Sequence, residues 1–108
     1  MRRGPLALAM WLAAVLPPPA AAQTAVAIHV FQFAPASIAV KPGTRVTWTN
    51  RDAIEHTVTA GTPQAPTGRF DERLPSSGAS ASVRFDDRGA HPYFCARHPS
   101  MRGEIRVD

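Results

Sequence analysis

Apolar and polar residues alternate along most of the chain after residue 25. Val46 and Trp48 alternate with two threonines, and the same period of two recurs over residues 80–85 and 104–107. Successive side chains of a β-strand point to opposite faces, so one face of each segment is expected to be buried. No stretch carries a convincing helical period. Short strands separated by turn residues predict an all-β protein, built as a sandwich or a barrel.

Two stretches depart from this alternation. The apolar positions 26 and 28 share one parity, whereas the phenylalanines at 31 and 33 share the other, which we interpret as a β-bulge near His29 and Val30. Residues 61–79 are rich in Gly, Pro and Ser and predict mainly a long connection. Phe70 and Leu74 are expected to anchor that connection onto the core.

The first 22 residues have the pattern of a cleaved secretory signal peptide. Arg2 and Arg3 precede an unbroken apolar run over residues 6–16, and three alanines at 20–22 offer a cleavage site before Gln23. The apolar run is too short to span a bilayer as an anchor. We therefore expect export to the periplasm, with a single domain over residues 23–108 and no stable membrane insertion after cleavage.

Charge and cysteine content narrow the possible functions. Removal of Arg2 and Arg3 with the leader lowers the formal net charge from +4 to +2, and the remaining basic residues form no run, so nucleic acid is not an expected partner. The chain has one cysteine, which cannot form an internal disulfide. A free thiol in an exported protein is exposed to oxidation, and binding to a metal would protect it.

That cysteine begins a compact set of possible metal ligands. Cys95 is followed by His98 and Met101, three and six residues later. A thiolate, an imidazole and a thioether suit copper, which favours two His and one Cys in a trigonal arrangement with a weak axial Met. A second His must come from elsewhere. His56 is the best candidate, because it shares its parity with Val58 and should point inward.

Other interpretations of these residues remain open at this point. Cys95 and Met101 could simply fill the core, or Cys95 and a histidine could form a nucleophilic pair in an enzyme. The other two histidines are weaker candidates for ligands. His29 lies in the expected bulge and His91 precedes a proline before a strand, and we expect both to be exposed to solvent.

The segment over residues 93–103, Tyr-Phe-Cys-Ala-Arg-His-Pro-Ser-Met-Arg-Gly, together with Val-Thr-Trp-Thr-Asn at 46–50 and His-Thr-Val at 56–58, resembles the cupredoxins, the small blue copper proteins. The resemblance covers nearly all of residues 26–108. The ligand loop, residues 95–101, has two residues between Cys95 and His98 and two between His98 and Met101, as in amicyanin. It implies a Greek-key β-sandwich. It also implies that His56, Cys95, His98 and Met101 hold one type 1 copper.

The chain departs from the family pattern close to this site. Thr57 stands where the family often has an Asn that braces the copper site, and Glu55 stands where Pro is frequent. Arg97 and Ser100 replace residues that are commonly Pro and Phe in the amicyanin loop. The apolar patch expected around His98 is therefore smaller and carries a positive charge.

These observations predict a monomeric periplasmic electron carrier that cycles between Cu(II) and Cu(I), and not an enzyme. The resemblance implies redox proteins as partners, such as a c-type cytochrome or a periplasmic dehydrogenase. The alternative is a copper carrier or storage protein, although such proteins often contain additional clusters of Met or His. A cysteine-nucleophile enzyme is a third possibility, and it would lose its activity on alkylation of Cys95.

Overall fold

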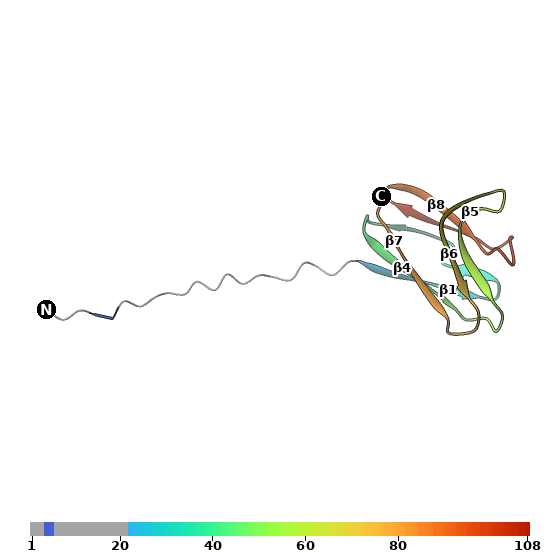
Figure 1. Ribbon diagram of the computed structural model, residues 1–108, viewed down its shortest axis with the longest axis horizontal. Coiled ribbons are helices and arrows are strands. Elements are labelled where there is room, and N and C mark those ends of the chain that lie inside the picture. The colour runs from blue at the N-terminus through green and yellow to red at the C-terminus, as the bar shows by residue number, and fades with distance from the viewer. Residues whose placement is uncertain (1–3, 6–21) are drawn as a thin grey trace.

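The computed structural model describes residues 4–5 and 22–108, so most of the predicted signal peptide lies outside the described residues. Residues 23–107 form nine strands (Figure 1). Their bounds are β1 Gln23–His29, β2 Gln32–Ala34, β3 Ser37–Val40, β4 Thr44–Asn50, β5 His56–Thr62, β6 Ala65–Leu74, β7 Ser80–Phe85, β8 Gly89–Phe94 and β9 Arg102–Val107. Within residues 22–108 the structure has no helix, as the alternating pattern predicts.

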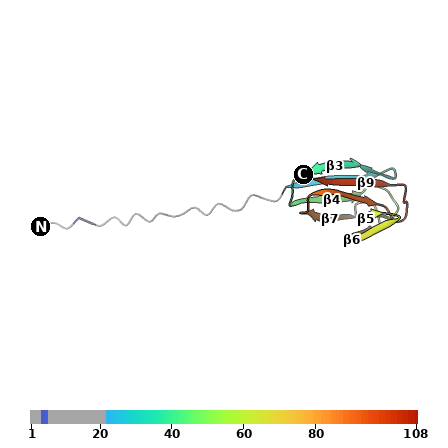
Figure 2. The same cartoon turned by 90° about the horizontal axis from the view of Figure 1, so that it is seen from above.

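The strands form two sheets that pack face to face (Figure 2). One sheet has four strands in the order β2-β1-β4-β7, and the other has five in the order β3-β9-β8-β5-β6. The pairs β1–β4 and β3–β9 are parallel, and the remaining neighbours are antiparallel. The predicted all-β Greek-key β-sandwich is confirmed.

The inward positions predicted from the alternation make up the core. Val46 and Trp48 are fully buried, and their partners on β7 are Val83 and Ala81. Ile105 and Val107 form the last buried pair. The expected anchors also hold, since Leu74 is fully buried and Phe70 packs against the core. Burial of these apolar faces, at about 25 cal/mol for each Å² removed from water, provides the main force that joins the sheets.

The change of parity near residue 30 arises from a turn, and the predicted β-bulge is wrong. β1 and β2 are antiparallel, with His29 opposite Gln32, so Val30 and Phe31 form a two-residue hairpin turn. Both turn residues have positive φ, 51° and 59°. The two-residue turn places Ile28 opposite Phe33, so residues on the same face of β1 and β2 differ in parity. No bulge is needed to explain the change.

The long connection predicted over residues 61–79 is also wrong for most of its length. Residues 65–74 form β6, the edge strand of the five-stranded sheet. An edge strand needs hydrogen-bond partners on one side only, so it tolerates Pro66. Its partner β5 has a register shift between Thr59 and Gly61. Gly61 has a φ of +102°, and a Cβ there would overlap the backbone of β6.

No helix among the described residues is long and apolar enough to cross a membrane.

The ends of three strands meet at one end of the sandwich and position the residues that sequence analysis singles out. β5 runs antiparallel to β8, and β8 runs antiparallel to β9. The start of β5, the end of β8 and the start of β9 therefore lie together, with the ligand loop between the last two (Figure 1).

Candidate metal centre

The loop between β8 and β9 is closed by its own backbone. The Cys95 amide donates to the Met101 carbonyl at 3.2 Å, and the Met101 amide donates to the His98 carbonyl at 2.9 Å. These two bonds hold three of the predicted ligand residues in one tight turn. Cys95 is fully buried, Met101 is almost so, and His98 is half-buried. Pro99 restricts His98 to extended backbone, which limits the positions that its ring can take.

His56 reaches the same place from the first position of β5, and its side chain is fully buried. The preceding loop is fixed by Asn50, whose buried amide group donates to the carbonyls of Ile54 at 2.7 Å and Leu74 at 3.0 Å. A satisfied buried amide of this kind makes the loop rigid. The position of His56 is therefore determined by the sheet on one side and by a braced loop on the other.

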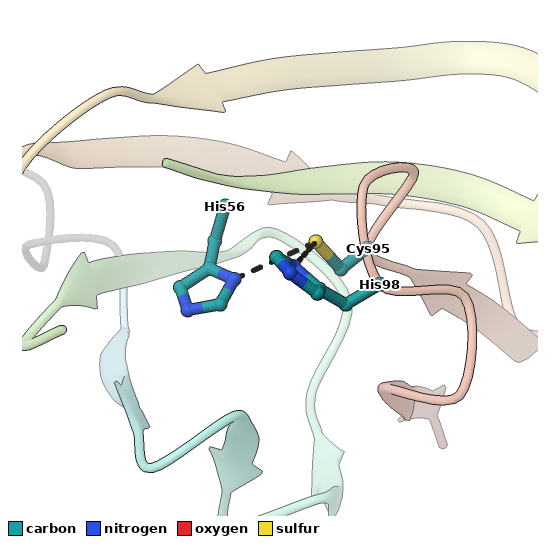
Figure 3. A group of neighbouring side chains, drawn as sticks. All are labelled: His56, Cys95 and His98. Atoms are coloured by element: carbon teal, nitrogen blue, oxygen red, sulfur yellow. Dashed lines mark hydrogen bonds between the residues drawn. The ribbon is translucent and has the colours of Figure 1, made fainter. Parts of the chain in front are cut away.

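The three donor atoms converge on one point (Figure 3). The Sγ of Cys95 lies 3.7 Å from the Nδ1 of His56 and 3.9 Å from the Nδ1 of His98, and all three atoms lie within 4.8 Å of one another. A metal about 2.0 Å from each nitrogen and about 2.3 Å from the sulfur, with ligands 120° apart, requires an S···N separation of about 3.7 Å. The two S···N separations therefore fit a trigonal His₂Cys metal site.

Met101 completes the chemistry expected for copper. It belongs to the same buried cluster as Cys95 and is 3% exposed. A thioether is a weak, soft donor, and it is the usual axial partner of a His₂Cys site. The structure therefore brings all four predicted residues to the same end of the sandwich.

Thr57 braces the cysteine, in the position where the family often has Asn. Its backbone amide donates to the Sγ of Cys95 at 3.3 Å, and its hydroxyl accepts the amide of Ala96 at 2.7 Å. The Thr57 hydroxyl then donates to Thr59, whose hydroxyl donates to Asp71. A threonine thus links the strand that carries His56 to the loop that carries Cys95.

Asp52 was not among the predicted site residues, yet it contacts a predicted ligand. Its Oδ2 accepts a hydrogen bond from the Nε2 of His56 at 2.8 Å, which leaves Nδ1 facing Cys95. Burial raises the pKa of the Asp52 carboxyl, but hydrogen bonds from the Phe31 and Val30 amides and from His56 outweigh it, and the pKa lies below its ordinary value. The only signal in the sequence is an acid four residues before the histidine, which also describes many ordinary turns.

Glu55 pairs with two arginines at the edge of the site. It accepts a hydrogen bond from Arg73 at 2.6 Å and forms an ion pair with Arg97 at 3.1 Å. The hydrogen bond from Arg73 lowers the pKa of Glu55, burial opposes this, and the charges of both arginines add to the lowering. The positive charge expected from Arg97 is therefore partly neutralised by a residue outside the loop.

The two remaining histidines lie outside the cluster. His29 is exposed, as expected, at the end of β1. His91 is half-buried and not fully exposed, because its ring lies against Phe85 and its Nε2 contacts the Asp87 carbonyl at 2.7 Å. Among the described residues, only His56, Cys95 and His98 form a group that could hold a metal.

A buried cysteine between two histidines, at the end of an all-β sandwich, defines a cupredoxin-type metal centre. Residues 20–108 match the family model of copper binding proteins of the plastocyanin/azurin family. The chain is similar to amicyanin-alpha of Methylorubrum extorquens, at 32% identity over 82% of this chain and 74% of that protein. It is also similar to plastocyanin of Scenedesmus fuscus, at 32% identity over 69% of this chain and 85% of that protein. The chain belongs to the plastocyanin/azurin family.

Solved structures support the same conclusion for the fold. A purple cupredoxin from Nitrosopumilus maritimus superposes with a TM-score of 0.71 at 24% identity, covering 81% of this chain and 99% of that one. An oxidised single-site mutant of amicyanin has a TM-score of 0.69 at 28% identity, covering 80% and 82%. Members of the family are copper-binding electron carriers and not enzymes, so the predictions of copper as cofactor and of electron transfer as function are confirmed.

Proposed function

We propose that His56, Cys95, His98 and Met101 hold one type 1 copper and that the mature protein carries electrons between redox proteins in the periplasm. The observation that supports this most directly is the pair of S···N separations, 3.7 and 3.9 Å, which match a trigonal site. When bound, copper supplies a one-electron couple between Cu(II) and Cu(I).

The protein's own contribution is rigidity and exclusion of water. His56 and Cys95 are fully buried, and the hydrogen bonds of Asn50 and Thr57 hold the two strand ends together. Little structural change is therefore needed when the charge of the metal changes. His98 is the one half-buried member of the trigonal set, so electrons enter and leave through its exposed edge.

One spectrum and one titration test this proposal. The Cu(II)-loaded protein is expected to show an intense visible band from the copper–thiolate bond, and one electron per chain should bleach it reversibly. A copper carrier or storage protein would instead be weakly coloured and would exchange its metal readily with a chelator. A colourless Cu(II) complex, or bleaching that is not reversible, would refute the electron-carrier proposal.

The partner is expected to present acidic groups around its docking site. Arg73, Arg97 and Arg102 lie at the ligand end of the sandwich, and Glu55 neutralises only part of their charge. Opposite charges steer association and can raise its rate by roughly 10-fold or more at low salt. A c-type cytochrome or a periplasmic dehydrogenase with such a surface fits this description.

Arg97→Glu should therefore slow electron transfer to the native partner by about 10-fold at low ionic strength, because it places a carboxylate beside Glu55. The visible band should not change. Stopped-flow measurements across ionic strength provide the test. Salt screens the charges and weakens steering, because the Debye length falls from about 10 Å at 0.1 M to about 3 Å at 1 M. Arg84→Glu is the matched control, because Arg84 lies opposite Arg45 at the start of β4, at the end of the sandwich away from the ligand loop. Equal slowing by both variants would contradict docking at the ligand end.

The proposed location requires removal of residues 1–22. We expect the exported protein to begin at Gln23, where the small-residue run ends and β1 begins. Intact mass of periplasmic material measures this directly. A mature protein that retained the first 22 residues would contradict the proposal.

A further inference from the structure

The two residues of the turn between β1 and β2 are of types that disfavour the backbone conformation they adopt. Val30 and Phe31 both have positive φ, and they are 65% and 48% exposed. Positive φ is unfavourable for a β-branched residue such as valine, and two-residue turns of this kind strongly prefer Asn and Gly. Strained residues of this sort persist only where the surrounding structure holds them, and they are common at functional sites.

Asp52 holds this turn from outside the hairpin. Its Oδ1 accepts the Val30 amide at 2.8 Å and its Oδ2 accepts the Phe31 amide at 3.0 Å. The same Oδ2 accepts the Nε2 of His56 at 2.8 Å. Asp52 is itself fixed, because its backbone amide donates to the Oδ1 of the buried Asn50 at 2.9 Å. One carboxylate therefore joins the strained turn to a predicted copper ligand.

The Val30–Phe31 turn also places an aromatic ring against His56 and His98. The Phe31 ring lies edge-on to His98 with centroids 4.9 Å apart, and edge-on to His56 at 5.4 Å. The two imidazoles lie 5.2 Å from each other. The three rings thus form one cluster, in which Phe31 packs against both imidazoles.

We propose that Asp52 is a positioning residue of the copper centre that acts on two sides at once. On one side it keeps the proton of His56 on Nε2, so that Nδ1 is free to bind the metal. On the other side it locks the Val30–Phe31 turn, so that Phe31 restrains both imidazoles. The proposal rests on the ligand assignment proposed above. Partners of a ligand's second nitrogen orient the ring and tune the metal, and a negative charge there favours Cu(II) over Cu(I).

The experiment compares Asp52→Ala and Asp52→Asn with the control Asp86→Asn, which removes the same charge from an exposed ion pair with Arg84. In copper-free protein, hydrogen exchange of the Val30 and Phe31 amides should be faster by roughly 10-fold or more in Asp52→Ala, as expected on losing a charged acceptor. Asp52→Asn keeps the shape of the side chain but has one acceptor oxygen, so at least one of these amides should be released.

Two further measurements separate positioning from simple support of the hairpin. Nitrogen NMR of the copper-free protein should show His56 protonated only at Nε2 in wild type and as a mixture of tautomers in Asp52→Ala. In the copper-loaded protein, Asp52→Asn should raise the reduction potential, and Asp86→Asn should leave it unchanged.

Faster exchange with an unchanged potential and tautomer would mean that Asp52 supports only the hairpin, and this would overturn the proposal. A changed potential without faster exchange would overturn it equally, because the turn would not depend on Asp52. Exchange and tautomer are measured without copper. They therefore stay informative even if wild type fails to show the blue band, a result that would refute the ligand assignment instead.

Discussion

Replacement of Cys95 by alanine is expected to abolish the visible band and to weaken copper binding by more than about 100-fold. Changes to residues that merely contact metal ligands already cost 10–100-fold in affinity, and Cys95 supplies the only thiolate in the chain. Its Sγ also accepts the Thr57 amide in the buried site, so the variant loses this contact as well. Absorption spectra and competition with a chelator measure the two effects.

Met101→Leu is the matched control for this loss. Leucine is close to methionine in volume and should keep the core packed, so the variant would lose only the weak contact that the Met101 thioether would make to bound copper. The variant should keep its colour and show a changed reduction potential. A Cys95→Ala protein that stayed blue would show that the ligand assignment is wrong, whatever the result for Met101→Leu.

The sequence predicts the fold well where burial decides the structure. Trp48 and Val46 on β4, and Ile105 and Val107 on β9, alternate with polar residues because one face of each strand is in the core. The four proposed ligand residues could be found in the sequence for a related reason. Their residue types are chemically unusual in combination, and their spacing follows from the ends of neighbouring strands.

The incorrect predictions concern backbone contacts that leave little trace in residue type. Val30 and Phe31 lack the Asn and Gly expected of a two-residue turn, because Asp52, distant in sequence, supplies the acceptors that hold them. β6 has an exposed, Gly- and Pro-containing sequence because it is an edge strand that pairs with β5 alone. The turn is fixed by a residue 21 or 22 positions further along the chain, whereas β6 is fixed by the strand directly before it.

The role of Asp52 and of Glu55 could not be predicted for a further reason. Both are acids in a short loop before His56, and their sequence positions do not distinguish a metal-site partner from a surface ion pair. The structure separates them, since Asp52 contacts the proposed ligand His56 whereas Glu55 contacts two arginines. The difference depends on where the loop places each carboxylate.

Gly103 provides the second large expected effect, because a side chain there would overlap a buried ring. Gly103 lies opposite Tyr93 in the pairing of β8 with β9. A Cβ at this position would come within 2.7 Å of the Tyr93 Cε1 and would overlap its Cζ and hydroxyl oxygen. Tyr93 is 1% exposed and packs against Phe33 and Trp48, with ring centroids 4.7 and 5.2 Å away, so its ring has no space into which it could move.

Gly103→Ala should therefore destabilise the protein by about 3 kcal/mol, at the upper end of the usual cost of overpacking a core. For a domain of this size, that loss should lower the Tm by more than about 10 °C. Urea denaturation of the copper-free protein measures the change without the contribution of the metal. The effect should be smaller in a Tyr93→Leu background, where the overlapping atoms are absent, and the double-mutant cycle should show a coupling of about 1 kcal/mol or more. An equal cost of Gly103→Ala in both backgrounds would show that the ring of Tyr93 is not the reason for glycine at this position.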